Sequence, residues 1–314
     1  MRHPGGGWVL AAAAFALTSA AAAAPAFAAG DVLAAADPTG ALLLTGDDLA
    51  NDFQIARDPA TQEFVVLGRN GTTVNGAAEW RTTDLRAIHA KLGAGDDVLA
   101  LGGFRLRGGL FADLGDGNDT LTLLHVTVRR RTTVLGGAGD DRVAFEGGCD
   151  LRGGATIVTA DGADTIRIAD SVVRGRLRLL TGEGDDRIEL HRNGLTDRAS
   201  LLIRTGDGAD VVDLLGTTFQ AGGRIVTADG ADQISMLTSR FREDLSIDGG
   251  GDDDRIDVDR STFDKSVRVH GGTGTNRMFV LGIQWTDGSG GLTAGARGSN
   301  DNFTWAFVIV HVFP

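Results

Sequence analysis

The sequence has no tyrosine, a single cysteine and only five prolines among its 314 residues. Because Cys149 stands alone, no disulfide can form within the chain, and the fold must hold without covalent cross-links. Lysine occurs only at Lys91 and Lys265, so nearly all positive charge is arginine. The formal net charge of -12 argues against a nucleic-acid partner, since phosphate binding needs a basic surface.

Long hydrophobic runs are also scarce, and the run at Trp8–Ala24 is mostly alanine. A membrane-spanning helix needs about 20 strongly apolar residues, so we expect no transmembrane span in the mature chain. The run follows a weakly basic start and precedes the small-x-small sequence Ala26-Phe27-Ala28, the pattern of a cleaved export signal. We therefore expect residues 1–28 to be a signal peptide, and the mature protein to be secreted, periplasmic or on the cell surface.

Glycine, in contrast, is abundant at 47 residues, and much of it follows one repeat. A Gly-x-Gly-x-Asp signature recurs from Gly93 to Asn276, becoming degenerate in the last two copies, and its final positions lie 22 to 24 residues apart. These final positions are Asp97, Asp119, Asp141, Asp164, Asp186, Asp210, Asp232, Asp254 and Asn276. The insertions of one residue before Asp164 and two before Asp210 predict loop bulges.

Apolar residues keep the same register as the repeat. Two positions after each final residue stand Leu99, Leu121, Val143, Ile166, Ile188, Val212, Ile234, Ile256 and Met278. Four positions after it stand Leu101, Leu123, Phe145, Ile168, Leu190, Leu214, Met236, Val258 and Val280. This alternation is typical of a strand with one buried face. A second strand precedes each glycine turn, and between the two strands Phe219, Phe241 and Phe263 share one register.

One repeat thus supplies two or three short strands, which can bury their faces only by stacking on the next repeat. Stacked strands lie about 4.8 Å apart, so like residues form columns. The sequence predicts an all-β fold over residues 93–280: a right-handed parallel β-helix, or solenoid, of about 22 residues per rung and roughly eight to nine rungs.

The flanks predict caps, which a solenoid needs to shield its open core and edge strands. Residues 29–92 contain strand signals and are expected to form an N-terminal β cap continuous with the solenoid. Residues 281–314 are expected to form a C-terminal cap. Within them the apolar segment Phe303–Phe313 is interpreted as a capping strand or plug, with docking into a membrane or partner as the alternative.

The stretch Gly136-Gly137-Ala138-Gly139-Asp140-Asp141 resembles the Gly-Gly-x-Gly-x-Asp repeat of haemolysin-type (RTX) calcium-binding proteins. In that family the motif recurs about every nine residues, with Ca²⁺ between successive turns, whereas here it recurs once per rung. The 22-residue rung is more similar to pectin-lyase-like β-helices and to secreted Gly/Asp-rich bacterial repeat proteins. The resemblance implies a fold and does not imply an activity.

The stacked aspartates raise the question of metal binding. Ionised carboxylates about 5 Å apart repel by roughly 3 kcal/mol at an effective dielectric of 20, so something must offset the charge. Hard oxygen ligands in flexible turns favour Ca²⁺, which predicts calcium at Asp97, Asp119, Asp141, Asp164, Asp186, Asp210, Asp232 and Asp254. The alternative is compensation by Arg142, Arg187, Arg255 and Arg277, which follow ladder positions, together with aspartates that cap turn amides.

No catalytic constellation stands out. Glycosidases need two carboxylates at a set separation, but carboxylate pairs recur in nearly every rung and mark only the repeat. His270-Gly271 faintly resembles a glycosidase element whose basic partner is missing here. We therefore expect a non-enzymatic, secreted structural or adhesive protein with calcium and cell-surface or matrix components as partners. The alternative is a carbohydrate-active β-helix enzyme, a polysaccharide lyase or glycosidase.

Overall fold

The structure, a computed structural model, describes residues 30–196, 199–285, 292–295, 304–307 and 311–312. The expected signal peptide, residues 1–28, lies outside the described residues. In the described part of the chain every regular element is a β-strand. No helix there is long and apolar enough to cross a membrane.

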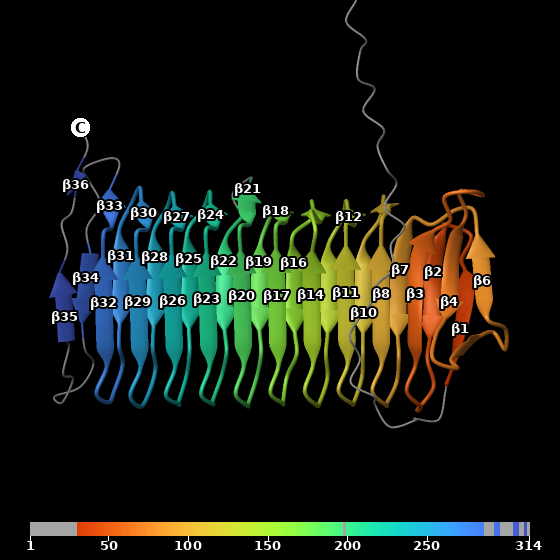
Figure 1. The fold of residues 1–314 in the computed structure, drawn as a ribbon, viewed down its shortest axis with the longest axis horizontal. Coiled ribbons are helices and arrows are strands. Elements are labelled where there is room, and N and C mark those ends of the chain that lie inside the picture. Colours follow the sequence, from red (N-terminus) through yellow and green to blue (C-terminus); the bar gives the residue numbers. More distant parts are fainter. Residues whose placement is uncertain (1–29, 197–198, 286–291, 296–303, 308–310, 313–314) are drawn as a thin grey trace, which may run out of the picture.

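The strands form three sheets that run along the molecule, of which the third begins only with the first repeat (Figure 1). The first sheet contains the strand that precedes each glycine turn. Its members are β1 (Asp31–Ala36), β2 (Ala41–Thr45), β5 (Thr73–Val74), β7 (Ala87–Lys91), β10 (Leu110–Asp113), β13 (Thr132–Leu135), β16 (Ala155–Val158), β19 (Leu177–Leu180), β22 (Leu201–Arg204), β25 (Gly223–Val226), β28 (Leu245–Asp248), β31 (Val267–His270) and β34 (Leu292–Gly295).

The second sheet contains the strand that follows each glycine turn. Its members are β3 (Asp52–Arg57), β4 (Phe64–Gly68), β6 (Glu79–Thr82), β8 (Val98–Gly102), β11 (Thr120–Leu124), β14 (Arg142–Glu146), β17 (Thr165–Ala169), β20 (Arg187–His191), β23 (Val211–Leu215), β26 (Gln233–Leu237), β29 (Arg255–Asp259), β32 (Arg277–Leu281) and β35 (Thr304–Phe307).

The third sheet is narrow and closes each rung. Its members are β9 (Arg105–Leu106), β12 (Thr127–Val128), β15 (Asp150–Leu151), β18 (Val172–Arg174), β21 (Gly194–Thr196), β24 (Thr218–Phe219), β27 (Arg240–Phe241), β30 (Thr262–Phe263), β33 (Gln284–Trp285) and β36 (His311–Val312).

Each rung passes once through all three sheets. The chain leaves the first sheet through the glycine turn, crosses the second sheet, bends at a corner into the third sheet, and returns through a short loop. Every strand from β7 to β33 pairs in parallel with its counterparts in the neighbouring rungs, in continuous register. This confirms the predicted parallel β-solenoid of about nine turns and about 22 residues per rung.

The predicted columns form the core between the sheets. The residues two positions after each ladder position, from Leu99 to Met278, are all buried, at most 2% exposed. Phe219, Phe241 and Phe263 stack along the third sheet, with ring centroids 4.1 and 6.0 Å apart, and Trp285 continues the column. Because neighbouring rungs place similar apolar residues at the same position, each core side chain packs against a similar side chain in the next rung.

The insertions fall in loops, as expected. The extra residue before Asp164 lies between β14 and β15, where Gly147 and Gly148 both have positive φ. The two extra residues before Asp210 lie between β21 and β22, a connection that includes residues 197–198, outside the described ones.

The N-terminal strands continue the sheets beyond the first repeat. β2 pairs in parallel with β7 and β3 with β8, so residues 41–57 form one additional rung. β1 and β4 then add antiparallel to this rung. That this region acts as a cap stays a prediction. At the other end β34, β35 and β36 extend all three sheets, and much of the predicted C-terminal cap lies outside the described residues.

Replacing one core residue should cost far more stability than replacing its outward neighbour. Ile234 is buried in β26, whereas the adjacent Gln233 is exposed. We expect Ile234→Ala to lower the free energy of unfolding by about 2–5 kcal/mol, as for other buried aliphatic residues. Gln233→Ala, the control, should change it by less than about 0.5 kcal/mol. Chemical denaturation measures both, and equal losses would mean that the buried face of β26 has been misassigned.

Candidate functional site: the aspartate ladder

The glycine turns stack backbone on backbone, which explains their glycine content. Gly139 has φ 128°, and a Cβ at this position would overlap the carbonyl oxygen of Gly117 one rung earlier. Glycine adopts this conformation readily and permits the close approach; the degenerate turn at 250–254 is an exception, with Asp252 at φ 68° in the equivalent position. The turns therefore lie directly on one another and bring the final aspartate of every repeat into a single column.

We call the column from Asp97 to Asp254 the aspartate ladder. Its eight carboxylates are buried, with at most 2% of each residue exposed. One oxygen of each, Oδ1, accepts the backbone N–H of the ladder residue one rung earlier. The N–H to Oδ1 pairs are Asp97–Asp119, Asp119–Asp141, Asp141–Asp164, Asp164–Asp186, Asp186–Asp210, Asp210–Asp232 and Asp232–Asp254, at 2.7 to 3.0 Å.

The same hydrogen bond continues at both ends of the ladder. Asp97 accepts the N–H of Asn51 at 2.7 Å, in the additional rung before the repeats. Asn276 replaces aspartate in the last repeat, and its Oδ1 accepts the N–H of Asp254 at 2.8 Å. An amide side chain therefore fulfils the structural role of the carboxylate.

The second carboxylate oxygen, Oδ2, has a different environment. In every ladder residue except Asp186, Oδ2 is buried and has no hydrogen-bond partner among the described residues. In Asp186 it accepts the N–H of Gly182 at 3.3 Å. A buried carboxylate with one unpartnered oxygen is costly when ionised.

Burial accordingly raises the pKa of the ladder carboxyls. The pKa rises to about 8 in Asp254, where the charges of Asp232, Asp252 and Asp253 add to burial. Burial also raises the pKa to about 7 in Asp97, Asp141 and Asp232, and to about 6 in Asp119, Asp164 and Asp210. The pKa of Asp186 is raised as well. Backbone amides oppose these shifts without cancelling them, and so do the neighbouring threonine hydroxyls beside Asp164, Asp186, Asp210 and Asp232.

The predicted compensation by arginines is wrong. Arg187 pairs with Glu189 at 2.6 Å and Arg255 with Asp257 at 2.8 Å, both on the outer face of the second sheet. Arg142 and Arg277 are also exposed, and in the described chain none of the four forms an ion pair with the ladder. The arginines alternate with buried strand residues, so they point away from the core. The other half of that alternative, amide capping, is confirmed, but the amides belong to the preceding rung.

The fit of the ladder to calcium is partial. Seven unpartnered Oδ2 atoms are oxygen donors of the kind that Ca²⁺ prefers. Among the described residues, however, no three His, Cys, Asp or Glu side chains form a group that could hold a metal ion. An ion there would depend on backbone carbonyls for most of its six to eight oxygens. Calcium binding by the ladder stays a prediction.

A second, exposed ladder runs beside the first in the opposite direction. Asp96 accepts the N–H of Asn118 at 2.8 Å, and Asn118 accepts that of Asp140 at 2.7 Å. Here the side chain reaches to the following rung, whereas the buried ladder reaches to the preceding one. The two adjacent acidic residues of the Gly-x-Gly-Asp-Asp turn therefore hydrogen-bond one rung to the rung before it and to the rung after it.

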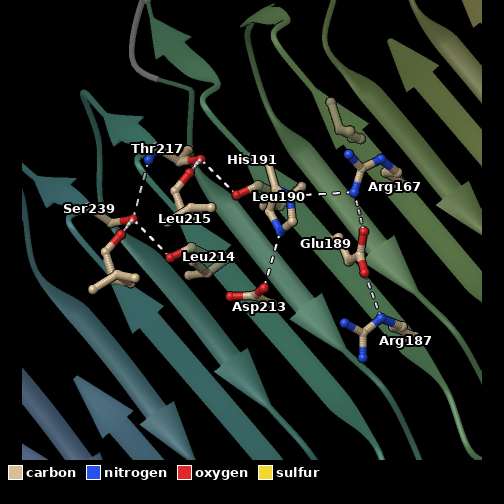
Figure 2. A network of polar contacts seen from close by, with 12 residues as sticks. Arg167, Arg187, Glu189, Leu190, His191, Asp213, Leu214, Leu215, Thr217 and Ser239 are labelled. Atoms are coloured by element: carbon tan, nitrogen blue, oxygen red, sulfur yellow. Dashed lines mark hydrogen bonds and ion pairs between the residues drawn. The ribbon is translucent and has the colours of Figure 1, made fainter. Parts of the chain in front are cut away.

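Sequence reasoning missed a polar column at the corner between the second and third sheets (Figure 2). The N–H of Thr217 donates to Ser239 Oγ at 3.2 Å, and the N–H of Ser239 donates to Ser261 Oγ at 3.1 Å. The Thr217 hydroxyl donates to the carbonyl of Leu190 at 2.9 Å. A signal was present, since a polar residue stands seven positions after five consecutive ladder residues. These are Ser171, Asn193, Thr217, Ser239 and Ser261.

A charged network on the outer face of the second sheet was also missed (Figure 2). Arg167 bridges Glu146, at 2.9 Å, and Glu189, while His191 Nε2 lies 3.1 Å from Asp213 Oδ2. Burial acts to raise the pKa of Glu189, but hydrogen bonds from Arg187 and Arg167 hold it below its usual value. Glu189 is therefore kept ionised, which suits an ion-pair network and is the opposite of what a general acid needs.

We compared the chain with protein-family models, with curated proteins and with solved structures, and found no match in any of the three. Its function is accordingly argued from the geometry of the rungs and of the ladder.

The raised pKa values predict that stability falls as the pH rises from about 5 to 8. The folded ladder holds protons that the unfolded chain, with aspartate pKa values near 3.9, has already released. Its contribution is complete below the unfolded pKa and is lost as the pH passes through 6 to 8. We expect a higher melting temperature at pH 5 than at pH 8 in the presence of a chelator. A melting temperature that is equal or higher at pH 8 would contradict a buried, proton-holding ladder.

Matched variants separate the hydrogen bond of the ladder from its charge. Asp254→Asn keeps the Oδ1 acceptor, as Asn276 does, and removes ionisation, so it should melt higher than the unmodified chain at pH 8. Asp254→Ala removes the acceptor of the buried Asp232 N–H and should cost about 1–3 kcal/mol. Melting curves at pH 5 and pH 8 measure both, and the difference between the two pH values should shrink in both variants.

Proposed function

We propose that the chain is a secreted structural or adhesive repeat protein that acts as a short, stiff rod. The observation that carries the proposal is the unbroken series of buried hydrogen bonds from Asn51 to Asn276. It links successive rungs along one side of a single core that extends through all of them. Because each repeat contacts only its neighbours, the ladder adds to every interface between rungs.

The connections between strands favour the same function. From β7 to β33, consecutive strands are joined by at most six residues, and the longest connections are the glycine turns. Binding and catalytic residues are disproportionately found on longer loops carried by a rigid scaffold. The repeats instead continue the three sheets with only these short connections between the strands, as expected of a structural protein.

The alternative, a carbohydrate-active enzyme on a pectin-lyase-like scaffold, is favoured only by the charged network around Arg167. The arginines that flank Glu189 hold it ionised, and Asp213 is engaged with His191. Both carboxylates thus already have partners within the network. The structural function therefore has the stronger support.

Stretching single molecules from their ends tests the proposed function. A rung of about 22 residues releases about 75 Å of chain when it is pulled straight, so extension should increase in whole multiples of that length. Ile234→Ala should lower the unfolding force, and Gln233→Ala should not. Unfolding without rung-sized steps, together with cleavage of any member of a panel of neutral and acidic polysaccharides, would replace the structural function by the enzymatic one.

Calcium binding would reinforce the rod and can be tested separately. At pH 8, where the ladder is most ionised, we expect millimolar Ca²⁺ to raise the melting temperature and a chelator to lower it. A ligand of the native state at a hundredfold excess over its Kd stabilises by about 2.7 kcal/mol. Mg²⁺ should do less, because it requires compact octahedral geometry and loses water reluctantly.

The control for the calcium experiment is an Asp→Asn change made outside the ladder and compared with the same change within it. Asp141→Asn alters a ladder residue whose Oδ2 has no partner among the described residues and should blunt the response to Ca²⁺. Asp257→Asn, on the outer face of the second sheet, should leave the response intact. Melting curves indifferent to Ca²⁺ and chelator at low and moderate salt would leave the aspartates with their hydrogen-bonding role alone.

A further inference from the structure

Despite the net charge of -12, one edge of the solenoid is strongly basic. Six arginines gather in the first four rungs, five in the loops that return from the third sheet to the first and one, Arg105, in β9. All six are exposed, and none forms an ion pair with another described residue. We call them the arginine edge: Arg105, Arg107, Arg129, Arg130, Arg131 and Arg176.

Strand pairing in the third sheet places some of these arginines directly beside one another in adjacent rungs. β9 pairs with β12 so that Leu106 lies beside Val128, and Arg107 and Arg129 each follow by one position. In the next rung Arg152 continues this column, and Asp150 pairs with both Arg152 and Arg174, at 2.8 and 2.9 Å. Among the described residues, no carboxylate pairs with Arg107 or Arg129. Like charges one rung apart repel by about 1 kcal/mol in water, which an external anion would relieve.

The glycine turns lie along the edge of the molecule opposite the third sheet (Figure 1). Their exposed side chains carry the opposite charge. One exposed carboxylate column lies on the solvent side of the buried ladder, and we call it the acidic edge: Asp116, Asp161, Glu183, Asp207 and Asp229. None of these side chains forms an ion pair within the described residues. Asp161, Glu183, Asp207 and Asp229 lie in successive rungs and repel one another, whereas Asp116 is separated from them by a rung that carries Ala138.

The two edges share one spacing, because both repeat with the rung at about 4.8 Å. The successive carboxylates from Asp161 to Asp229 of a second molecule therefore lie at the same interval as Arg107 and Arg129. Guanidinium groups also bind carboxylates through two parallel hydrogen bonds, which an ammonium group cannot do. This common spacing favours a second copy of the chain over an unrelated acidic polymer.

We propose that the arginine edge binds the acidic edge of a second copy, so that the solenoids associate side by side. The inference rests on the proposed structural function and names its partner. Each molecule uses a different surface from its neighbour, so every pair leaves one arginine edge and one acidic edge open. Association then continues into arrays and does not stop at a dimer.

Sedimentation velocity on the full chain, with chelator present to prevent bridging by calcium, tests the proposal. We expect concentration-dependent association at about 0.01 M salt, where the Debye length is about 30 Å, and its loss at about 1 M, where it is about 3 Å. The triple variant Arg129→Glu, Arg130→Glu, Arg131→Glu should weaken association by about tenfold or more.

The matched control carries the same change in charge elsewhere. Arg204, Arg224 and Arg268 are exposed on the outer face of the first sheet and form no ion pair with described residues. Changing these three to glutamate should weaken association far less. A second variant with Asp161→Arg, Glu183→Arg and Asp207→Arg should also fail to associate alone, and mixing it with the arginine-edge variant should restore association. Melting curves confirm that each variant is folded.

Three results would overturn the proposal: a monomer at low salt and high concentration, equal loss in the control variant, or no recovery on mixing. A monomer that binds poly-glutamate through Arg129–Arg131 would assign the edge to a different acidic polymer. The stretching experiment is made on single molecules, so its outcome is independent of these results, and failure of the rod and failure of its association are distinguishable.

Discussion

The hydrogen bond from a buried backbone N–H to the aspartate of the following rung is the interaction on which the structure depends. The glycine turn brings backbones too close for any side chain at Gly139, and it leaves amides that the strands do not satisfy. The ladder supplies their acceptors at 2.7 to 3.0 Å. Unsatisfied buried amides are costly, so the turns could not stack tightly without it. The regular columns of the core follow from that stacking.

Using a buried carboxylate as the acceptor of this hydrogen bond has an energetic cost. The column must be an oxygen acceptor, yet a buried carboxylate resists ionisation, and the pKa of Asp254 rises to about 8. Asparagine performs the same role at Asn276 without a charge. With aspartate in the other eight rungs, we expect the stability of the solenoid to depend on proton concentration. The hydrogen bonds between rungs and the expected sensitivity to pH thus arise from the same carboxyl groups.

The strands and the core could be predicted because period-two alternation and a fixed repeat length determine which side chains face inward. Both patterns placed Leu99, Leu121 and Val143 on the buried face, where the structure has them. The direction of the ladder could not be predicted, because an aspartate in a turn can reach its own, the preceding or the following amide. Arg187 follows a ladder residue in sequence, but strand geometry turns it outward to Glu189. The corner column escaped detection because Ser171, Asn193 and Thr217 share a hydrogen-bonding role and differ in residue type.

The strictly nearest-neighbour pattern of these contacts has a consequence for the length of the protein. A ladder residue such as Asp186 binds the amide of Asp164 and offers its own to Asp210. If a complete 22-residue unit were removed, the flanking units would present the same donors, acceptors and apolar columns to each other. Deletion or tandem duplication of whole units is therefore neutral to the bonding scheme, whereas gain or loss of a few residues within a turn is not. The number of units is adjustable, and the reach of the molecule can be altered without redesign of its interior.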